Sequence, residues 1–351
     1  MHLATFVAST FLFNTAIAWI PSPITAIQKG FSYGSNTPNF STSFNAANHL
    51  QGTTGFTSAR LYTTIAINTT SDPSPAIQAA LNAPGTTLLL GMWVSPGTTT
   101  NLAAYYAERD AMYKAFKQFP ALKQIVVGIS VGNEDLYRAY STANPTGKPL
   151  GNGATTDALN MAIKDLRKNL TSIGIANIPI GHVDTWQMWT DNGIGGQIIP
   201  NLDFIGMNGF PYWEGYMATN SSDFFYGLKS VQNTAKAANN VPVWITETGY
   251  PVAGDAINGP GNRTQGIPSP NAAQTYWNLV ACPLLKQATT NLWYYTLSDK
   301  GSYPTFGLTN ATDGTTPFDL SCKNAAAATG PTGPNKRQAY QKKARTYQGG
   351  S

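Results

Sequence analysis

Short apolar runs with the alternation typical of β-strands recur about eight times along the chain, and helical spacing separates most of them. The predicted strands are Lys29–Gly34, Ala59–Thr64, Thr87–Val94, Gln124–Glu134, Ile178–Trp186, Phe204–Tyr212, Val241–Tyr250 and Asn291–Leu297. The predicted helices are Thr42–Leu50, Pro75–Asn82, Leu102–Phe119, Asp157–Ile173, Ser222–Ala238 and Asn271–Ala288. Alternating strands and helices predict a parallel sheet covered by helices, and eight units favour a closed (β/α)₈ TIM barrel over a doubly wound open sheet.

The chain has no Pro/Ser linker that would divide it, so a single barrel domain is predicted over residues 19–322. Residues 1–18 are predicted to be a signal peptide, because the apolar stretch Leu3–Phe13 precedes the small-x-small pattern Ala16-Ile17-Ala18. A buried first element is the alternative. No other run reaches the roughly 18 apolar residues of a membrane span. We therefore expect a secreted, extracellular or cell-wall protein.

The formal charge of +5 belongs to the end of the chain. Residues 323–351 form a basic tail whose six cations are Lys323, Lys336, Arg337, Lys342, Lys343 and Arg345. The remainder carries a small net negative charge and no basic patch, which argues against a nucleic-acid partner. The tail is interpreted as a solvated terminus, with adhesion to an anionic surface as the alternative.

Secretion would also allow the cysteines to form a disulfide and the asparagine sequons to be glycosylated. Cys282 and Cys322 are either one disulfide or two buried thiols. Six Asn-x-Ser/Thr sequons are candidate glycosylation sites, at Asn39, Asn68, Asn169, Asn220, Asn262 and Asn310. Only 11% of the residues are charged, which suits a protein that works on neutral polymers outside cells.

Polar and aromatic residues gather where the predicted strands end, which is where barrel enzymes place their sites. The candidate substrate-binding residues are Tyr33, Tyr62, Trp93, Asn133, Asp184, Trp186, Asn208, Tyr212, Trp213 and Tyr250. Aromatic rings pack against the apolar faces of sugars, so several of them are interpreted as sugar platforms. Ordinary core packing is the alternative for each ring.

Two of the four glutamates, Glu134 and Glu247, end the fourth and seventh predicted strands. Alternation places Val127, Ile129 and Val131 toward the helices and Glu134 in the barrel mouth. Glycoside hydrolysis with retention needs two carboxyl groups about 5–5.5 Å apart, and the fourth and seventh strands face each other across an eight-stranded barrel.

The alternative for both glutamates is a structural role, in which they cap loops or pair with Arg60 or Arg138. Of the other two glutamates, Glu108 is expected to be solvated on a helix and Glu214 to lie in a loop.

The chain resembles glycoside hydrolase family 17, the β-1,3-glucanases and glucanosyltransferases of plants and fungi. The resemblance lies in Lys29-Gly-Phe-Ser-Tyr-Gly34, Ser58-Ala-Arg-Leu-Tyr62, Val127-Gly-Ile-Ser-Val-Gly-Asn-Glu-Asp-Leu-Tyr-Arg138, Gly181-His-Val-Asp-Thr-Trp186, Gly206-Met-Asn-Gly-Phe-Pro-Tyr212, Thr246-Glu-Thr-Gly-Tyr-Pro251 and Phe306-Gly-Leu-Thr-Asn310. It implies that Glu134 is the acid/base, that Glu247 is the nucleophile and that Asn133 holds the sugar 2-OH. It also implies a β-1,3-glucan substrate and no cofactor.

The chain departs from the family pattern in three places. Phe210 stands where members usually carry a tyrosine, so Tyr212 or Tyr33 is expected to supply that phenol. The eighth strand reads Leu297-Ser-Asp-Lys300 in place of Phe-Asp-Glu, which leaves Lys300 as a further binding candidate. The connection after the sixth strand is too short for the added subdomain of plant members, which favours glycosyl transfer to another glucan over transfer to water.

Other classes of function fit less well. Gly128-Ile-Ser-Val-Gly132 matches a serine-hydrolase elbow, but Ser130 lies within a strand rather than at a turn. A non-catalytic glucan-binding barrel remains the alternative of another class. No His/Cys/Asp cluster has metal-ligand spacing, and we expect a monomer.

Overall fold

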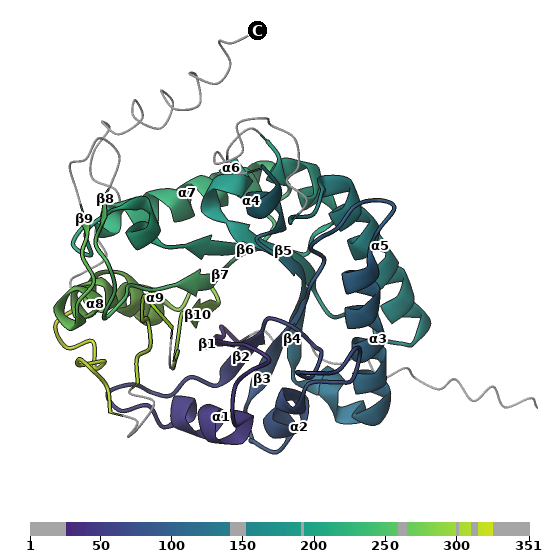
Figure 1. The fold of residues 1–351 in the computed structure, drawn as a ribbon, viewed down its shortest axis with the longest axis horizontal. Helices are drawn as coiled ribbons and strands as arrows, with labels where there is room; N and C mark the ends of the chain where they lie inside the picture. The colour runs from purple at the N-terminus through teal and green to yellow at the C-terminus, as the bar shows by residue number, and fades with distance from the viewer. Residues whose placement is uncertain are drawn as a thin grey trace, which may run out of the picture.

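Eight parallel strands close into a barrel in the computed structural model, which describes residues 26–140, 152–190, 193–258, 265–299, 302–309 and 315–325 (Figure 1). The strands are β1 (Lys29–Tyr33), β2 (Ser58–Leu61), β3 (Thr87–Met92), β4 (Val126–Asn133), β5 (Ile180–Thr185), β6 (Phe204–Gly209), β7 (Val243–Thr248) and β10 (Leu292–Tyr294). They follow the order β1-β10-β7-β6-β5-β4-β3-β2 around the barrel. The predicted TIM barrel is confirmed.

Helices follow the strands and surround the barrel (Figure 1). They are α1 (Phe40–Asn48), α2 (Pro75–Leu81), α3 (Ala103–Gln118), α4 (Asp135–Tyr140), α5 (Thr156–Ser172), α6 (Trp186–Thr190), α7 (Ser221–Ala237), α8 (Pro270–Tyr276) and α9 (Cys282–Gln287). Asn39 and Thr155 cap α1 and α5 by accepting backbone N–H groups, and Pro75 occupies the first turn of α2.

Shorter pieces complete the connections. They are the 3₁₀ turns Pro120–Gln124, Gly195–Gln197, Ile199–Asn201 and Pro211–Glu214, the π turn Trp277–Ala281, and an antiparallel pair of β8 (Ile257–Asn258) and β9 (Gln265–Gly266). The connection after β6 passes through one 3₁₀ turn into α7, without the added subdomain. Among the described residues, no helix is both long and apolar enough to cross a membrane.

An inner apolar layer fills the barrel and leaves its carboxyl end as the mouth. Its members are Leu89, Val127, Phe204 and Trp293, with Trp244 stacked on Phe204 at 3.8 Å between ring centroids. A Cβ at Gly181 would lie 2.5 Å from the Phe204 ring, so a glycine is needed for the ring to fill this space.

One prediction about β4 is wrong. Val127 packs inside the barrel rather than toward the helices, because the register between β3 and β4 shifts at Leu88/Leu89. Ile129 and Val131 do pack in the outer core, between strands and helices.

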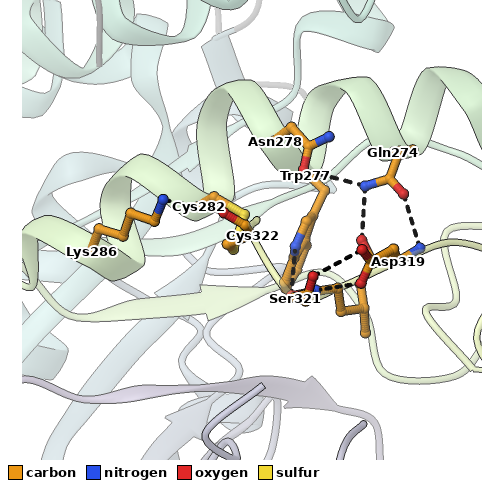
Figure 2. Close-up of a disulfide and its surroundings, with 9 residues drawn as sticks. Gln274, Trp277, Asn278, Cys282, Lys286, Asp319, Ser321 and Cys322 are labelled. Carbon is orange, nitrogen blue, oxygen red and sulfur yellow. Dashed lines mark hydrogen bonds between the residues drawn. A yellow bond between two sulfur atoms is a disulfide. The ribbon is translucent and has the colours of Figure 1, made fainter. Parts of the chain in front are cut away.

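Residues 319–322 are linked to helices α8 and α9 by a disulfide and by hydrogen bonds (Figure 2). Cys282 in α9 forms a disulfide with Cys322. Gln274 in α8 also donates to the Asp319 carbonyl at 2.8 Å and accepts from its backbone N–H at 2.9 Å. These contacts join residues 319–322 to the α8–α9 pair. The predicted signal peptide, the tail beyond Ala325 and Lys300 lie outside the described residues.

Candidate active site

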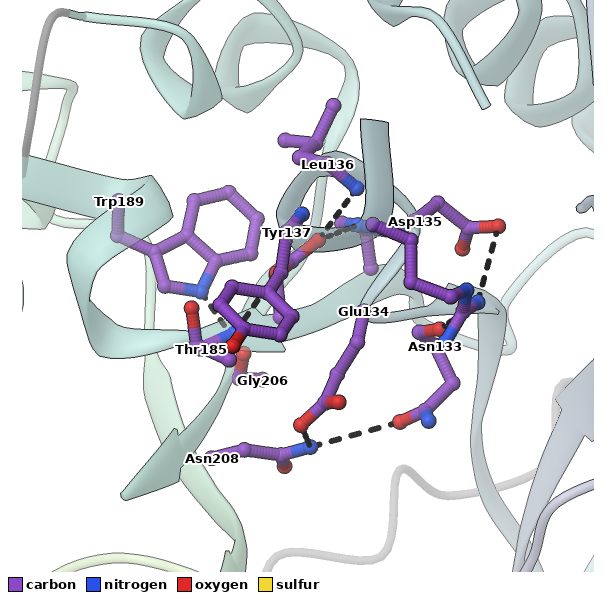
Figure 3. Close-up of polar contacts among 12 residues, drawn as sticks. Asn133, Glu134, Asp135, Leu136, Tyr137, Thr185, Trp189, Gly206 and Asn208 are labelled. Carbon is purple, nitrogen blue, oxygen red and sulfur yellow. Dashed lines mark hydrogen bonds and ion pairs between the residues drawn. The ribbon is translucent and has the colours of Figure 1, made fainter. Parts of the chain in front are cut away.

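The turn at the end of β4 carries Asn133 and Glu134 into the barrel mouth (Figure 3). Gly132 has a φ of 89° and Glu134 a φ of 53°, both in the left-handed region. The register between β4 and β5 also shifts between Ser130 and Asn133. Regular alternation would point neighbouring side chains to opposite faces. The irregular turn instead lets both side chains reach the mouth.

Asn208 at the end of β6 contacts both residues of this turn. Its Nδ2 donates to Oε1 of Glu134 at 2.9 Å and lies 3.5 Å from Oδ1 of Asn133 (Figure 3). The Thr246 hydroxyl donates to Oδ1 of Asn208 at 2.8 Å. That contact fixes the amide so that its NH₂ group faces Glu134.

Glu247 in β7 forms an ion pair with Arg60 in β2 at 2.5 Å. Arg60 is only 1% exposed, and its second terminal nitrogen donates to Oδ1 of Asn133 at 2.7 Å. Glu247 is also the register partner of Asn208 across the β6–β7 pair. A continuous set of contacts therefore links Glu247 to Glu134 through Arg60, Asn133 and Asn208.

The two carboxyl groups have different surroundings. Burial, and after it the negative charge of Glu247, raise the pKa of Glu134 to about 7. Glu247 is held against a guanidinium group. One carboxyl is thus suited to hold a proton near neutral pH while the other faces a fixed positive charge, and acid and nucleophile require such different surroundings.

The phenols close to Glu247 are not the ones the sequence indicated. Tyr212 donates its hydroxyl to the Asp255 carbonyl at 2.7 Å, and Tyr33 is buried against Phe44. The charge of Glu247 instead acts on the partly exposed Tyr62 and Tyr295: burial and then this charge raise the pKa of both, for Tyr295 to about 12.

Tyr295 lies beside Phe210. Its ring meets that of Phe210 edge-on, with 5.6 Å between ring centroids. A phenol ring from the segment after β10 is therefore present next to Phe210.

Four of the predicted substrate-binding residues are corrected by their burial. Trp186 donates its indole N–H to Glu214 at 2.7 Å, and Tyr250 donates to the Tyr216 carbonyl at 3.0 Å. Together with Tyr33 and Tyr212, these rings are at most 6% exposed, so they support the mouth from behind rather than offering a face to a sugar.

Asp184 is also corrected, because it is wholly buried and accepts the Leu136, Tyr137 and Thr185 backbone N–H groups. Its carboxylate therefore organises the turn of Glu134 instead of meeting the substrate.

Two predicted platforms remain accessible. Trp213 is 52% exposed and lies beside Tyr212, with 4.8 Å between ring centroids. Trp93 is partly exposed. The guanidinium carbon of Arg138 lies over its indole ring, 5.2 Å from the centroid of that ring. Both rings can meet the apolar face of a sugar from the end of a strand or the turn after it.

Glu108 was expected to be solvated, and this expectation is wrong. Its carboxyl is buried and accepts the Thr64 N–H at 2.9 Å and the Trp93 N–H at 3.3 Å. Burial raises its pKa to about 7. Helical spacing contained the signal, since Tyr105, Glu108 and Met112 share one face of α3 and all three are buried.

Arg60 is the principal site residue that the sequence analysis did not assign to function. The signal was a charged residue inside the apolar strand β2, which has no solvent to face. Among the described residues, no group of three or more His, Cys, Asp or Glu side chains could hold a metal ion.

The fold and this pair of carboxyls are those of a glycoside hydrolase domain. The chain belongs to the family described as the BtgE/BtgC glycoside hydrolase domain, which matches residues 30–303.

Individual relatives agree with the resemblance to family 17. The chain is 41% identical over 314 residues to an Aspergillus oryzae protein named "Probable glucan endo-1,3-beta-glucosidase eglC". It is 40% identical to an Aspergillus niger protein of the same name. These alignments cover 86% of this chain but only 64% and 65% of the two relatives.

A solved structure supports the same family. The glycoside hydrolase family 17 beta-1,3-glucanosyltransferase from Rhizomucor miehei is 25% identical, with a TM-score of 0.58. The match covers 84% of this chain and 98% of that one.

Proposed function

We propose that this chain cleaves β-1,3-glucan with retention of configuration, with Glu247 as nucleophile and Glu134 as acid/base. The observation that carries the proposal is the Arg60–Asn133–Asn208 connection, which holds both carboxyls in one barrel mouth. The raised pKa of Glu134 supports its role as the proton donor. The β-1,3-glucan substrate is supported by the printed names of the relatives.

The reaction has two balanced steps. Glu247 bonds to the anomeric carbon as the glycosidic bond breaks, and Glu134 gives its proton to the leaving oxygen. Glu134 then takes a proton from the acceptor hydroxyl, which bonds to the same carbon as the bond to Glu247 breaks. Asn133, held by Arg60, is placed to bind the sugar 2-OH, a contact that strengthens in the transition state.

The acceptor is proposed to be a second glucan chain, which would make the protein a glucanosyltransferase. The short connection from β6 to α7 leaves Trp213 exposed at the rim, where a sugar ring can stack. Water is the alternative acceptor, and the protein would then be an endo-β-1,3-glucanase.

Product analysis on defined β-1,3-glucan oligomers tests these roles. Transfer gives products longer than the substrate, whereas only shorter products at every concentration would exclude it. The first-formed anomer must be β, so initial release of the α-anomer would contradict retention. Glu247→Gln is the control. If this variant kept full activity, the alternative of a non-catalytic glucan-binding barrel with a contaminating enzyme would be favoured.

We also propose that the protein is secreted and works at the cell wall. The pattern Leu3–Phe13 with Ala16-Ile17-Ala18 supports this, as does a disulfide between Cys282 and Cys322, since disulfides persist in oxidising compartments. N-terminal sequencing of protein from culture medium tests it. The mature chain should begin at Trp19, and retention of the protein in the cell would contradict secretion.

A further inference from the structure

His182 lies wholly buried in β5, directly beneath the turn that presents Glu134. Its ring meets the edge of Trp189, with 5.7 Å between centroids. The side chain cannot reach a substrate, and the proposed reaction does not use it. A buried titratable group under a candidate catalytic turn nevertheless needs a physical account.

Both ring nitrogens of His182 face acceptors. Nδ1 lies 2.7 Å from the Val131 carbonyl, and Nε2 lies 3.1 Å from Oδ2 of Asp184. A carbonyl offers only lone pairs. The Asp184 carboxyl already accepts three backbone N–H groups, so it is required in its acceptor form. A neutral imidazole carries one N–H and can satisfy only one of the two contacts. The imidazolium satisfies both.

The local charges favour the same form. Asp135 and Asp184 are both wholly buried, and Arg138 lies 3.6 Å from Asp135. Burial raises the pKa of Asp135, whereas a positive charge on His182 lowers it, so a charged ring and an ionised Asp135 favour each other. Burial lowers the pKa of His182, but the hydrogen bond and charge of Asp184 and the charge of Asp135 outweigh it, so the pKa lies above the ordinary value.

Gly132 shows how tightly this cluster holds the turn. A Cβ at this position would lie 2.1 Å from Oδ2 of Asp135 and 3.0 Å from the His182 ring. The glycine therefore lies between the carboxylate and the imidazole. Its positive φ begins the irregular backbone that ends at Glu134.

We propose that His182 is a charged positioning residue, an imidazolium that ties the Val131 carbonyl of β4 to Asp184 of β5 and so fixes the turn that presents Glu134. The Glu134 backbone N–H also donates to the Val183 carbonyl of β5 at 2.8 Å. Three consecutive residues of β5 thus hold the turn. The effect on catalysis rests on the proposed function, but the charge state does not.

The charge state is tested by ¹⁵N NMR of the histidine rings in the intact protein. The chain has three histidines, His2, His49 and His182, and His49 at the end of α1 serves as the internal reference. At pH 8 an imidazole of ordinary pKa, about 6.5, is only about 3% protonated. We expect both nitrogens of His182 to carry protons at this pH. A spectrum showing one protonated nitrogen would overturn the proposal.

The positioning role is tested with His182→Gln, which removes the charge, and with His49→Gln as the matched surface control. The four glutamate carboxyls can be followed by ¹³C NMR. Without the imidazolium, less positive charge opposes that of Asp184, so we expect the pKa of Glu134 to rise above its wild-type value. A loosened turn should lower kcat at least tenfold, by rough estimate, with little change in KM.

A role confined to stability predicts a different result. His182→Gln would then lower Tm and leave both the Glu134 titration and kcat unchanged, which would overturn the positioning role. If His182→Gln does not fold, the wild-type ¹⁵N spectrum still decides the charge. An absence of activity on any glucan would refute the proposed function while leaving both NMR results interpretable.

Discussion

Arg60 and Glu247 form a buried ion pair across the barrel, with Nη1 and Oε1 2.5 Å apart. Their strands, β2 and β7, are separated in the sheet by β1 and β10, so the pair spans the interior rather than joining neighbours. Buried ion pairs contribute little net stability, because the cost of desolvation offsets the attraction. The ion pair instead contributes to positioning, because the Arg60 guanidinium orients both Glu247 and Asn133.

Replacing Arg60 separates charge from geometry. Arg60→Lys keeps a cation but cannot reproduce two donors in a fixed fork, so we expect kcat/KM to fall by about 10- to 100-fold while the protein stays folded. Arg60→Met leaves the Glu247 carboxylate unpaired and should lower the free energy of unfolding by about 3–5 kcal/mol at pH 7. Kinetics and urea unfolding measure the two effects. Full activity in Arg60→Lys would show that charge alone suffices.

The pH dependence of activity should report Glu134. Its raised pKa, about 7, keeps the proton needed by the leaving oxygen up to neutral pH. Above pH 7 we expect kcat/KM to fall toward a tenfold loss per pH unit, because the ionised fraction of Glu134 cannot act as the acid. A profile that stays flat to pH 9 would exclude Glu134 as the group that titrates.

The same pKa predicts a pH-dependent stability. The folded-state pKa of Glu134 lies above the unfolded value of 4.5, so its contribution is fully present below pH 4.5 and is lost as the pH rises through 7. Glu134→Gln removes this titration. Relative to wild type, the variant should gain up to about 3 kcal/mol between pH 4.5 and pH 8. Urea unfolding at both pH values measures the gain, and a constant difference would contradict the raised pKa.

The alternation of strands and helices was sufficient to predict the barrel and to place Glu134 and Glu247 at strand ends, because both follow from local periodicity. Periodicity could not predict how deeply a side chain near the barrel mouth is buried. Trp186 and Trp213 both follow strands. The Trp186 side chain is buried and donates a hydrogen bond to Glu214, whereas the Trp213 side chain is exposed. That difference arises from packing between segments distant in sequence.

The shape of the turn at Glu134 could not be predicted from the sequence either. Its shape depends on left-handed backbone at Gly132 and on tertiary contacts from β5, where His182 and Asp184 bind groups of β4 and α4. Strand alternation alone would have placed Asn133 away from the mouth. A pattern can therefore indicate which residues take part, but the arrangement that brings Arg60, Asn133 and Asn208 together is set by the closed barrel.

The disulfide gives a prediction about stability. Cys282 and Cys322 are 40 residues apart, and closing a loop of this length stabilises the folded state by about 4 kcal/mol in the chain-entropy account. Cys282→Ser should therefore lower Tm by roughly 6 °C. Scanning calorimetry with and without a reductant measures the change. Because the reductant removes the same bond, it should lower Tm in wild type but leave the variant unchanged; a variant that still responded would contradict the pairing.

The neighbouring rings Tyr212 and Trp213 should respond to truncation in opposite ways. Trp213 is 52% exposed, so Trp213→Ala should leave Tm nearly unchanged and remove a surface on which a sugar can stack. We expect about a fivefold rise in KM for oligomers, or about 1 kcal/mol of lost apolar contact. Tyr212 is 1% exposed, and Tyr212→Ala should cost about 3–5 kcal/mol of folding free energy. Oligomer kinetics and urea unfolding on both variants measure the contrast. If Trp213→Ala lowered stability as much as Tyr212→Ala and left KM unchanged, Trp213 would belong to the core rather than to the binding surface.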